Sequence, residues 1–177
     1  VAATSIASDS LRLAGQRGWI PMSSSNLVPQ YLKGHWEVVA EGAANAGLTP
    51  DRKQWHISRE VFVAETNELA RERARVVLGR NYIEHQRANR VGSGLIAGSK
   101  KDPNMADEAV DVDYLMDNLW IVGGPQECAD QIRQLYEEVG GFGTLLNITQ
   151  DPEDSQWEHD CLRLLMEEVG PKVADLG

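Results

Sequence analysis

Positive charge is scarce in this sequence, which has 17 Lys and Arg residues against 27 Asp and Glu residues and a net charge of −10. Nucleic-acid binding draws most of its affinity from clustered Lys and Arg. The charge balance therefore argues against a nucleic-acid partner and against an anionic membrane surface. No apolar run approaches the roughly 18–20 residues that a membrane-spanning helix needs, so no membrane association is expected.

Cysteine is scarce as well, with only Cys128 and Cys161 in the sequence. Both lie within helical patterns and neither belongs to a metal-type spacing, so we expect no disulfide scaffold and no metal site. The first residues also lack the basic segment and apolar stretch of a secretory signal. These observations together predict a cytoplasmic protein.

The 177 residues suit one globular domain, and 42% hydrophobic and 25% charged residues are ordinary for such a domain. A chain of this size can bury a sizeable core. Val1 opens an apolar stretch and no initiator Met precedes it. We therefore expect the chain to be a fragment whose amino-terminal portion is missing.

A strand-then-helix pattern occurs four times and predicts a parallel α/β fold. In one expected helix, over residues 28–46, Leu32, Trp36, Val39 and Ala43 form a single apolar face. The last helix is expected to bury a stripe that includes Met166, and the helix after residue 65 a stripe that includes Val76. The expected strands are residues 1–3, 19–22, 56–64 and 142–149.

Residues 88–118 break this pattern with glycines, lysines and an acidic stretch that follow no period. Irregular segments longer than about 12–15 residues in a compact domain are usually lids or disordered. We therefore expect a flexible, lid-like insertion there, before the last β/α unit.

Four parallel strands with helices on only some faces leave apolar surface uncovered. Two such halves would close an eight-stranded barrel of about 250 residues. The pattern therefore predicts the carboxyl-terminal half of a (β/α)8 barrel over residues 1–177, equivalent to strands 5–8. An open doubly wound sheet is the alternative, because the local pattern does not distinguish a closed sheet from an open one.

The segment from Thr4 to Ser8 joins the end of the first expected strand to a helix. Free N–H groups and hydroxyls at such a position suit a phosphate group. The alternative is plain helix capping, since Ser and Thr are preferred N-caps. Asp9 already places a negative charge at this helix end, which opposes a bound anion.

The end of the second expected strand carries Met22 and a run of serines from Ser23 to Ser25. A flavin or nucleobase ring could rest against Met22 while the hydroxyls reach its polar edge. The alternative is that Met22 fills the core and the serines form a loop.

Other residues that could carry chemistry form no recognisable constellation. The four histidines are neither spaced as helical pairs nor paired with cysteines, which disfavours a metal site; they are His35, His56, His85 and His159. His56 and His85 remain candidates for acid/base groups, although surface or core roles are more common. The sequence has no G-x-S-x-G nucleophile motif and no phosphate-binding P-loop.

Several segments together resemble luciferase-like flavin-dependent monooxygenases, the family of bacterial luciferase and limonene monooxygenase. The resemblance spans nearly the whole chain, in the family's order. It rests on Val1-Ala2-Ala3-Thr4-Ser5, Gly18-Trp19-Ile20-Pro21-Met22, Val122-Gly123-Gly124-Pro125-Gln126-Glu127-Cys128, Phe142-Gly143-Thr144-Leu145-Leu146 and Val169-Gly170-Pro171.

The resemblance implies a barrel that binds reduced FMN, supplied by a separate flavin reductase, and uses O2 to oxygenate a small organic substrate. It places the flavin phosphate at Thr4, Ser5 and Ser8, and the flavin ring near Met22 and Ser23. It also implies a homo-oligomer and a mobile loop over the site at residues 88–118. The family's catalytic His and phosphate-binding Arg belong to the first half of the barrel, so this chain alone is expected to be inactive.

Two other interpretations remain open at this point. One is an oxidoreductase on the same barrel that uses a deazaflavin and transfers hydride. The other is a non-enzymatic flavin-binding homologue or a proteolytic remnant.

Overall fold

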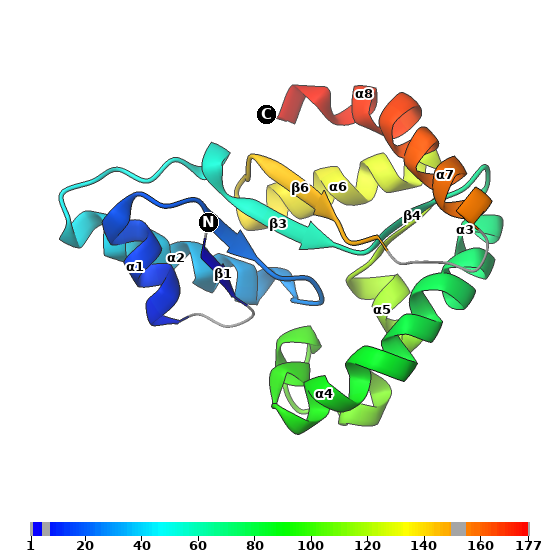
Figure 1. The fold of residues 1–177 in the computed structure, drawn as a ribbon, viewed down its shortest axis with the longest axis horizontal. Coiled ribbons are helices and arrows are strands. Elements are labelled where there is room, and N and C mark those ends of the chain that lie inside the picture. Colours follow the sequence, from blue (N-terminus) through cyan, green and yellow to red (C-terminus); the bar gives the residue numbers. More distant parts are fainter. Residues whose placement is uncertain (1, 5–7, 150–154, 177) are drawn as a thin grey trace.

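Two sheets, each made of parallel strands, form the centre of the computed structural model (Figure 1). The structure describes residues 2–4, 8–149 and 155–176. The larger sheet has the order β1-β2-β3-β6 and the smaller pairs β4 with β5, and all of these neighbours are parallel. The strands are β1 (Ala2–Thr4), β2 (Pro21–Ser23), β3 (His56–Arg59), β4 (Val61–Val63), β5 (Ile121–Gly123) and β6 (Thr144–Asn147). The predicted parallel α/β class is confirmed.

Helices connect each pair of parallel neighbours that follow one another in the chain, β1 to β2 and β2 to β3, and also lie between β4 and β5 and between β5 and β6. The α-helices are α1 (Asp9–Arg17), α2 (Pro29–Asn45), α3 (Asn67–Ala74), α4 (Arg87–Gly92), α5 (Val112–Asn118), α6 (Pro125–Val139), α7 (Ser155–Leu164) and α8 (Gly170–Val173). Short 3-10 turns occupy Arg52–Gln54, Leu95–Ser99, Asp107–Ala109 and Ala174–Leu176.

Helix α2 follows its predicted pattern closely. Its first residue is Pro29, whose fixed φ suits the first helical turn. Leu32, Trp36 and Val39 are buried on one face and pack with Ile57 of β3. This apolar cluster holds α2 against the larger sheet, so the face of the sheet that carries Ile57 is the covered one.

Helices α1 and α2 cross at two glycines. A Cβ atom on Gly15 would overlap the carbonyl oxygen of Val39, and one on Gly42 would overlap the carbonyl oxygen of Arg12. The two backbones therefore approach each other more closely than any residue with a side chain would allow. This contact fixes the position of α1 against α2.

The predicted strand over residues 56–64 is interrupted. It forms β3 and β4, with Glu60 between them. β3 pairs with β2 and β6, whereas β4 pairs with β5, so the chain changes partners at Glu60. The break therefore separates the two sheets and places a carboxyl group where they meet.

Two predicted helical stripes were wrong in part. Val76 is 50% exposed and Met166 is 73% exposed, although both were expected to be buried. Each lies in a π-helical turn, Arg75–Gly79 or Leu165–Val169. A π turn inserts an extra residue relative to the α-helical period, so the apolar face shifts at that point.

Residues 88–118 contain more regular structure than expected. They include most of α4, the turns Leu95–Ser99 and Asp107–Ala109, and α5. Ile96, Val110 and Leu115 from this segment are buried in the larger core cluster. The segment therefore packs against the rest of the chain through its own apolar residues.

Among the residues that the structure describes, no helix has both the length and the apolar composition that a bilayer crossing requires.

Candidate functional site

The carboxyl ends of β1 and β2 lie side by side, as parallel pairing requires. Thr4, the last residue of β1, is the register partner of Ser23, the last residue of β2. In parallel α/β folds this edge of the sheet carries the ligand. The structure thus brings together the two strand ends at which the sequence predicted cofactor contacts. Ser5 lies outside the described residues.

Ser8 is the N-cap residue of α1, with extended backbone angles of φ −146° and ψ 167°. Its carbonyl oxygen accepts the N–H groups of Leu11 and Arg12, at 3.0 and 3.2 Å. Its side chain makes no capping hydrogen bond to the helix.

Met22 lies on the opposite face of the sheet from the α2 cluster. Its register partner is His56, which in turn pairs with Thr144, and all three are half-buried. Successive residues of a strand alternate between the two faces, so these side chains lie away from buried Ile57. They form a row on the less covered face of the larger sheet.

Ser23 is fully buried on the helix-covered face. Its Oγ lies 2.9 Å from Nδ1 of His35 and accepts the Nε1–H of Trp55 at 3.0 Å. Nε2 of His35 is buried without a hydrogen-bond partner. Burial lowers the pKa of His35 to about 4, so its ring is neutral at physiological pH.

A second polar cluster follows β2 and was not predicted. Ser25 and Asn26 both donate to Oε1 of Glu60, at 2.9 and 3.0 Å, and Glu60 is 2% exposed. Nε1 of Trp120 donates to Oδ1 of Asn26 at 2.8 Å. The loop after β2, the break between β3 and β4, and the start of β5 therefore meet at one buried amide.

The segment around α4 joins this cluster. Arg90 donates from Nη2 to the carbonyl oxygen of Asn26 at 3.0 Å and to Oγ of Ser99 at 3.0 Å. Ser99 donates to the same carbonyl oxygen at 2.6 Å, and Nδ2 of Asn26 donates to Oε1 of Gln86 at 3.2 Å. We call the residues that meet here the Asn26 cluster: Asn26, Glu60, Gln86, Arg90, Ser99 and Trp120.

Burial raises the pKa of Glu60, while the hydrogen bond from Ser25 and the charges of Arg59 and Arg90 oppose this effect. Its Oε2 atom is buried with no hydrogen-bond partner. Both donors contact Oε1, so burial of the unpartnered Oε2 is what raises the pKa of this carboxyl group. A signal for this site was present in the sequence, since a carboxyl group within an apolar strand needs a buried partner.

Glu60→Gln is expected to reduce the loss of stability at rising pH. An acid whose pKa is higher in the folded state stabilises the fold below its ordinary pKa, and this contribution is lost as pH rises towards the folded value. In urea unfolding, the free energy of unfolding of Glu60→Gln relative to that of the wild type should therefore rise from about pH 5 to about pH 8. Parallel profiles would contradict the assignment; Glu84→Gln, at an exposed glutamate, is the control.

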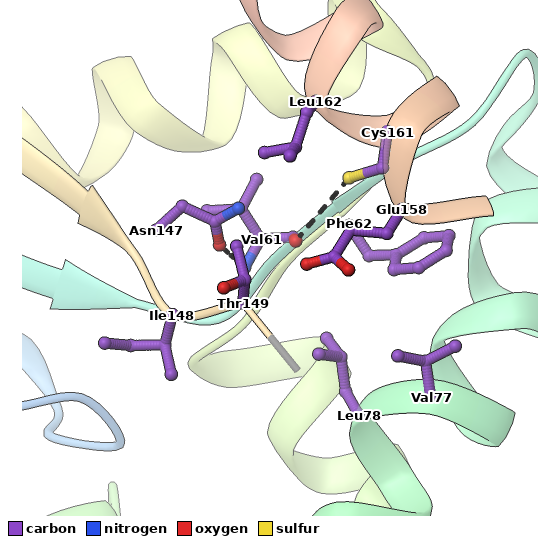
Figure 2. A pocket seen from close by; sticks show the side chains of 10 residues that line it. All are labelled: Val61, Phe62, Val77, Leu78, Asn147, Ile148, Thr149, Glu158, Cys161 and Leu162. Carbon is purple, nitrogen blue, oxygen red and sulfur yellow. Dashed lines mark hydrogen bonds between the residues drawn. The ribbon is translucent and has the colours of Figure 1, made fainter. Parts of the chain in front are cut away.

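A hollow opens where β6 ends, between β4, the turn Arg75–Gly79 and α7 (Figure 2). Val61, Phe62, Val77 and Leu78 form apolar walls, and Glu158 projects between them towards Thr149. Asn147 and Cys161 also border the hollow, but Val61 already engages them, through its N–H to Asn147 Oδ1 at 3.1 Å and its carbonyl oxygen near Sγ of Cys161. The hollow is thus chiefly apolar. Neither Met22 nor Ser8 lines it.

The remaining histidines and the two cysteines come from several separate elements. His85 and His159 are exposed. Of the two acid/base candidates, His56 and His85, only His56 lies on a strand of the larger sheet. Cys128 and Cys161 are free and buried, and burial raises the pKa of both thiols. Within the described part of the chain, no group of three or more His, Cys, Asp or Glu side chains is arranged to hold a metal ion.

A model of the luciferase-like monooxygenase family matches residues 1–142. The chain belongs to this family. The resemblance inferred from the sequence motifs is thereby confirmed. The parallel sheet of this luciferase-like chain agrees with the parallel α/β fold that the sequence predicted.

Two curated relatives are monooxygenases. The chain is 33% identical to 3,6-diketocamphane 1,6-monooxygenase from Pseudomonas putida, over 94% of this chain and 44% of the relative. It is 32% identical to limonene 1,2-monooxygenase from Rhodococcus erythropolis, over 94% of this chain and 42% of that relative. This luciferase-like chain thus spans less than half the length of each.

Two solved structures also match this chain. The oxygenating constituent of 3,6-diketocamphane monooxygenase from P. putida, a type II Baeyer-Villiger monooxygenase in complex with FMN, matches with a TM-score of 0.87 and 33% identity. The match covers 97% of this chain and 47% of that one. The coenzyme F420-dependent tetrahydromethanopterin reductase from Methanopyrus kandleri matches with a TM-score of 0.61 at 19% identity, over 96% of this chain and 49% of that one, and shares the fold.

Proposed function

We propose that this chain is the carboxyl-terminal half of an FMN-dependent monooxygenase barrel. The observation that carries the proposal is the order β1-β2-β3-β6 of four parallel strands in a chain that matches an FMN-bound monooxygenase over about half of that protein's length. Strands β1 and β6 are the two edges of this sheet, and a barrel closes only when both edges are paired. The second half of the barrel would supply that pairing.

The residues at the carboxyl edge fit an FMN phosphate. Ser8 is the N-cap residue of α1, and Thr4 ends the neighbouring strand. A helix N-terminus attracts a phosphate through its free N–H groups and its dipole. We assign the phosphate to Thr4, Ser5 and Ser8, with Asp9 as the one opposing charge at this end.

Met22 is assigned to the flavin ring, because its half-buried side chain lies on the less covered face of the sheet. The hydroxyl of Ser23 is engaged by His35 and Trp55, so Ser23 contributes to the ring contact through its main chain. When bound here, reduced FMN from a separate reductase would supply the two electrons needed for one atom of O2 to enter the substrate while the other leaves as water. The chain's own contribution is to hold and orient the cofactor and to exclude water.

The relatives' names favour a small alicyclic ketone or terpene as the substrate. Residues 88–118 are assigned to a lid over the site, since Arg90 and Ser99 contact the loop after β2. The intact protein is proposed to be a cytoplasmic homo-oligomer. A deazaflavin-dependent oxidoreductase is the second candidate, favoured by the shared fold of the F420-dependent reductase.

The test compares the chain alone with a chimera in which it replaces the corresponding stretch of the P. putida 3,6-diketocamphane monooxygenase. Fluorescence titration should show no FMN binding at micromolar concentrations for the chain alone, and binding and ketone oxygenation by the chimera. Micromolar binding by the chain alone would contradict the half-barrel assignment. Turnover with reduced deazaflavin but not with reduced FMN would favour the second candidate.

Ser8→Ala in the chimera should weaken FMN binding about tenfold, because one charge-assisted hydrogen bond is lost. Ser10→Ala is the matched control, since Ser10 is an exposed serine in the first turn of the same helix. Equal affinity of Ser8→Ala and the wild-type chimera would exclude Ser8 from the phosphate site. Equal weakening by both variants would point to the helix as a whole.

A further inference from the structure

Asn26 has an unusual backbone conformation. With φ at 59°, it is the one non-glycine residue with a positive φ among the residues that the structure describes. Asn tolerates this left-handed region better than most residues, but the conformation still has an energetic cost. Such a conformation persists only where surrounding contacts fix it. The contacts of Asn26 therefore show which parts of the chain this conformation connects.

Every polar group of the Asn26 side chain is used, and each partner comes from a different part of the chain. Oδ1 accepts from Trp120, while Nδ2 donates to Glu60 and to Gln86. These partners lie 94, 34 and 60 residues away in sequence. A single buried amide thus connects β2 with the start of β5, the break between the sheets, and the turn that leads into α4.

The carbonyl oxygen of Asn26 makes a second set of contacts, with Arg90 and Ser99. Arg90 also donates to the carbonyl oxygen of Leu95, which closes the segment on itself. The N–H of Val28 donates to the carbonyl oxygen of Gly98 at 2.9 Å. The stretch 86–99 is therefore attached to residues 26–28 at both of its ends.

These contacts hold α4 next to the loop that follows β2, at the carboxyl edge of the larger sheet (Figure 1). Replacement of the amide would remove the partner of Nε1 of Trp120, one of the two donors to Oε1 of Glu60, and the donor to Oε1 of Gln86. An unpaired buried polar group is unfavourable, so these groups would separate to reach water. The side chain thus holds the loop in the conformation in which its carbonyl oxygen meets Arg90 and Ser99.

We propose that Asn26 is a positioning residue that fixes residues 86–99 over the carboxyl edge of the sheet and so shapes the entrance to the site above it. Its consequence for substrate rests on the proposed function, whereas its effect on the segment does not. Asn26 contacts no cofactor or substrate in this role. It acts through Arg90, Ser99 and Gln86.

Hydrogen–deuterium exchange of Asn26→Gly tests the proposal, because glycine keeps the positive φ and removes only the side chain. Exchange of peptides from residues 86–99 should rise at least tenfold, while exchange of α6 stays within about twofold of the wild type. Asn89→Ala is the matched control. The exposed side-chain amide of Asn89 donates to the carbonyl oxygen of His85, one turn earlier in the chain. Wild-type exchange at 86–99, or an equal rise in α6, would overturn the proposal.

A kinetic readout in the chimera distinguishes this inference from the proposed function. Asn26→Gly should raise the KM for the ketone about tenfold and leave the Kd for FMN within about twofold. An unchanged KM would overturn the role in shaping the entrance. Faster exchange at 86–99 in a chimera that binds no FMN would uphold the positioning role and reject the flavin assignment.

Discussion

Gly42→Ala is expected to lower the free energy of unfolding by about 3 kcal/mol, although alanine favours helices over glycine by about 1 kcal/mol. A Cβ atom on Gly42 would overlap the carbonyl oxygen of Arg12, a backbone atom that moves only if the whole of α1 moves. Gly15→Ala should have an effect of similar size, because its Cβ would meet the carbonyl oxygen of Val39. Urea unfolding measures both variants.

Gly34→Ala is the matched control in the same helix, because no atom lies within 4 Å of the Cβ that it would add. This variant should raise the free energy of unfolding by about 0.5–1 kcal/mol through helix propensity alone. The close approach of α1 and α2 thus predicts opposite signs for the same chemical change at two positions of one helix. A stabilising Gly42→Ala would show that the helices lie further apart than the structure has them.

Acid should destabilise the chain through His35. Burial lowers the pKa of His35 to about 4, whereas an unfolded histidine titrates near its ordinary value of 6.5. Below 6.5 the unfolded chain binds the proton and the folded chain does not, so stability is lost as pH falls from 6.5 through 4. A difference of about 2.5 pKa units corresponds to about 3 kcal/mol once the pH is below both values.

His35→Asn should remove this part of the pH dependence, because an amide does not titrate in this range. The smaller side chain leaves a cavity, which lowers stability by the same amount at every pH and leaves the slope as the readout. His159→Asn, at an exposed histidine, should retain the wild-type slope. A slope for His35→Asn equal to that of the wild type would show that His35 titrates alike in the folded and unfolded chains.

Local sequence patterns predicted the elements whose geometry depends on near neighbours. The apolar face of α2 follows from rules that span a few residues. The same rules placed Thr4 and Met22 on adjacent strand ends, because parallel strands end at a common edge. They failed at Val76 and Met166, where π turns change the helical period.

The Asn26 cluster could not be derived in this way, because its contacts join residues up to 94 positions apart. A serine-rich run followed by Asn resembles an ordinary loop until Glu60, Arg90 and Trp120 are placed around it. The same holds for the hydroxyl of Ser23, whose contacts with His35 and Trp55 no local pattern could give. A strand pattern predicts that side chains alternate, but only the packed helices show which face each one occupies.

The order of amino acids alone determined the α/β class, the family and the strand ends at which a cofactor is expected, because periodicity and short motifs are local properties. Tertiary structure alone decided that the chain changes partner strands at Glu60, that α1 and α2 touch through Gly15 and Gly42, and that one amide holds residues 86–99 in place. These features depend on which distant groups exclude water from one another, and burial of that kind is a property of the folded chain.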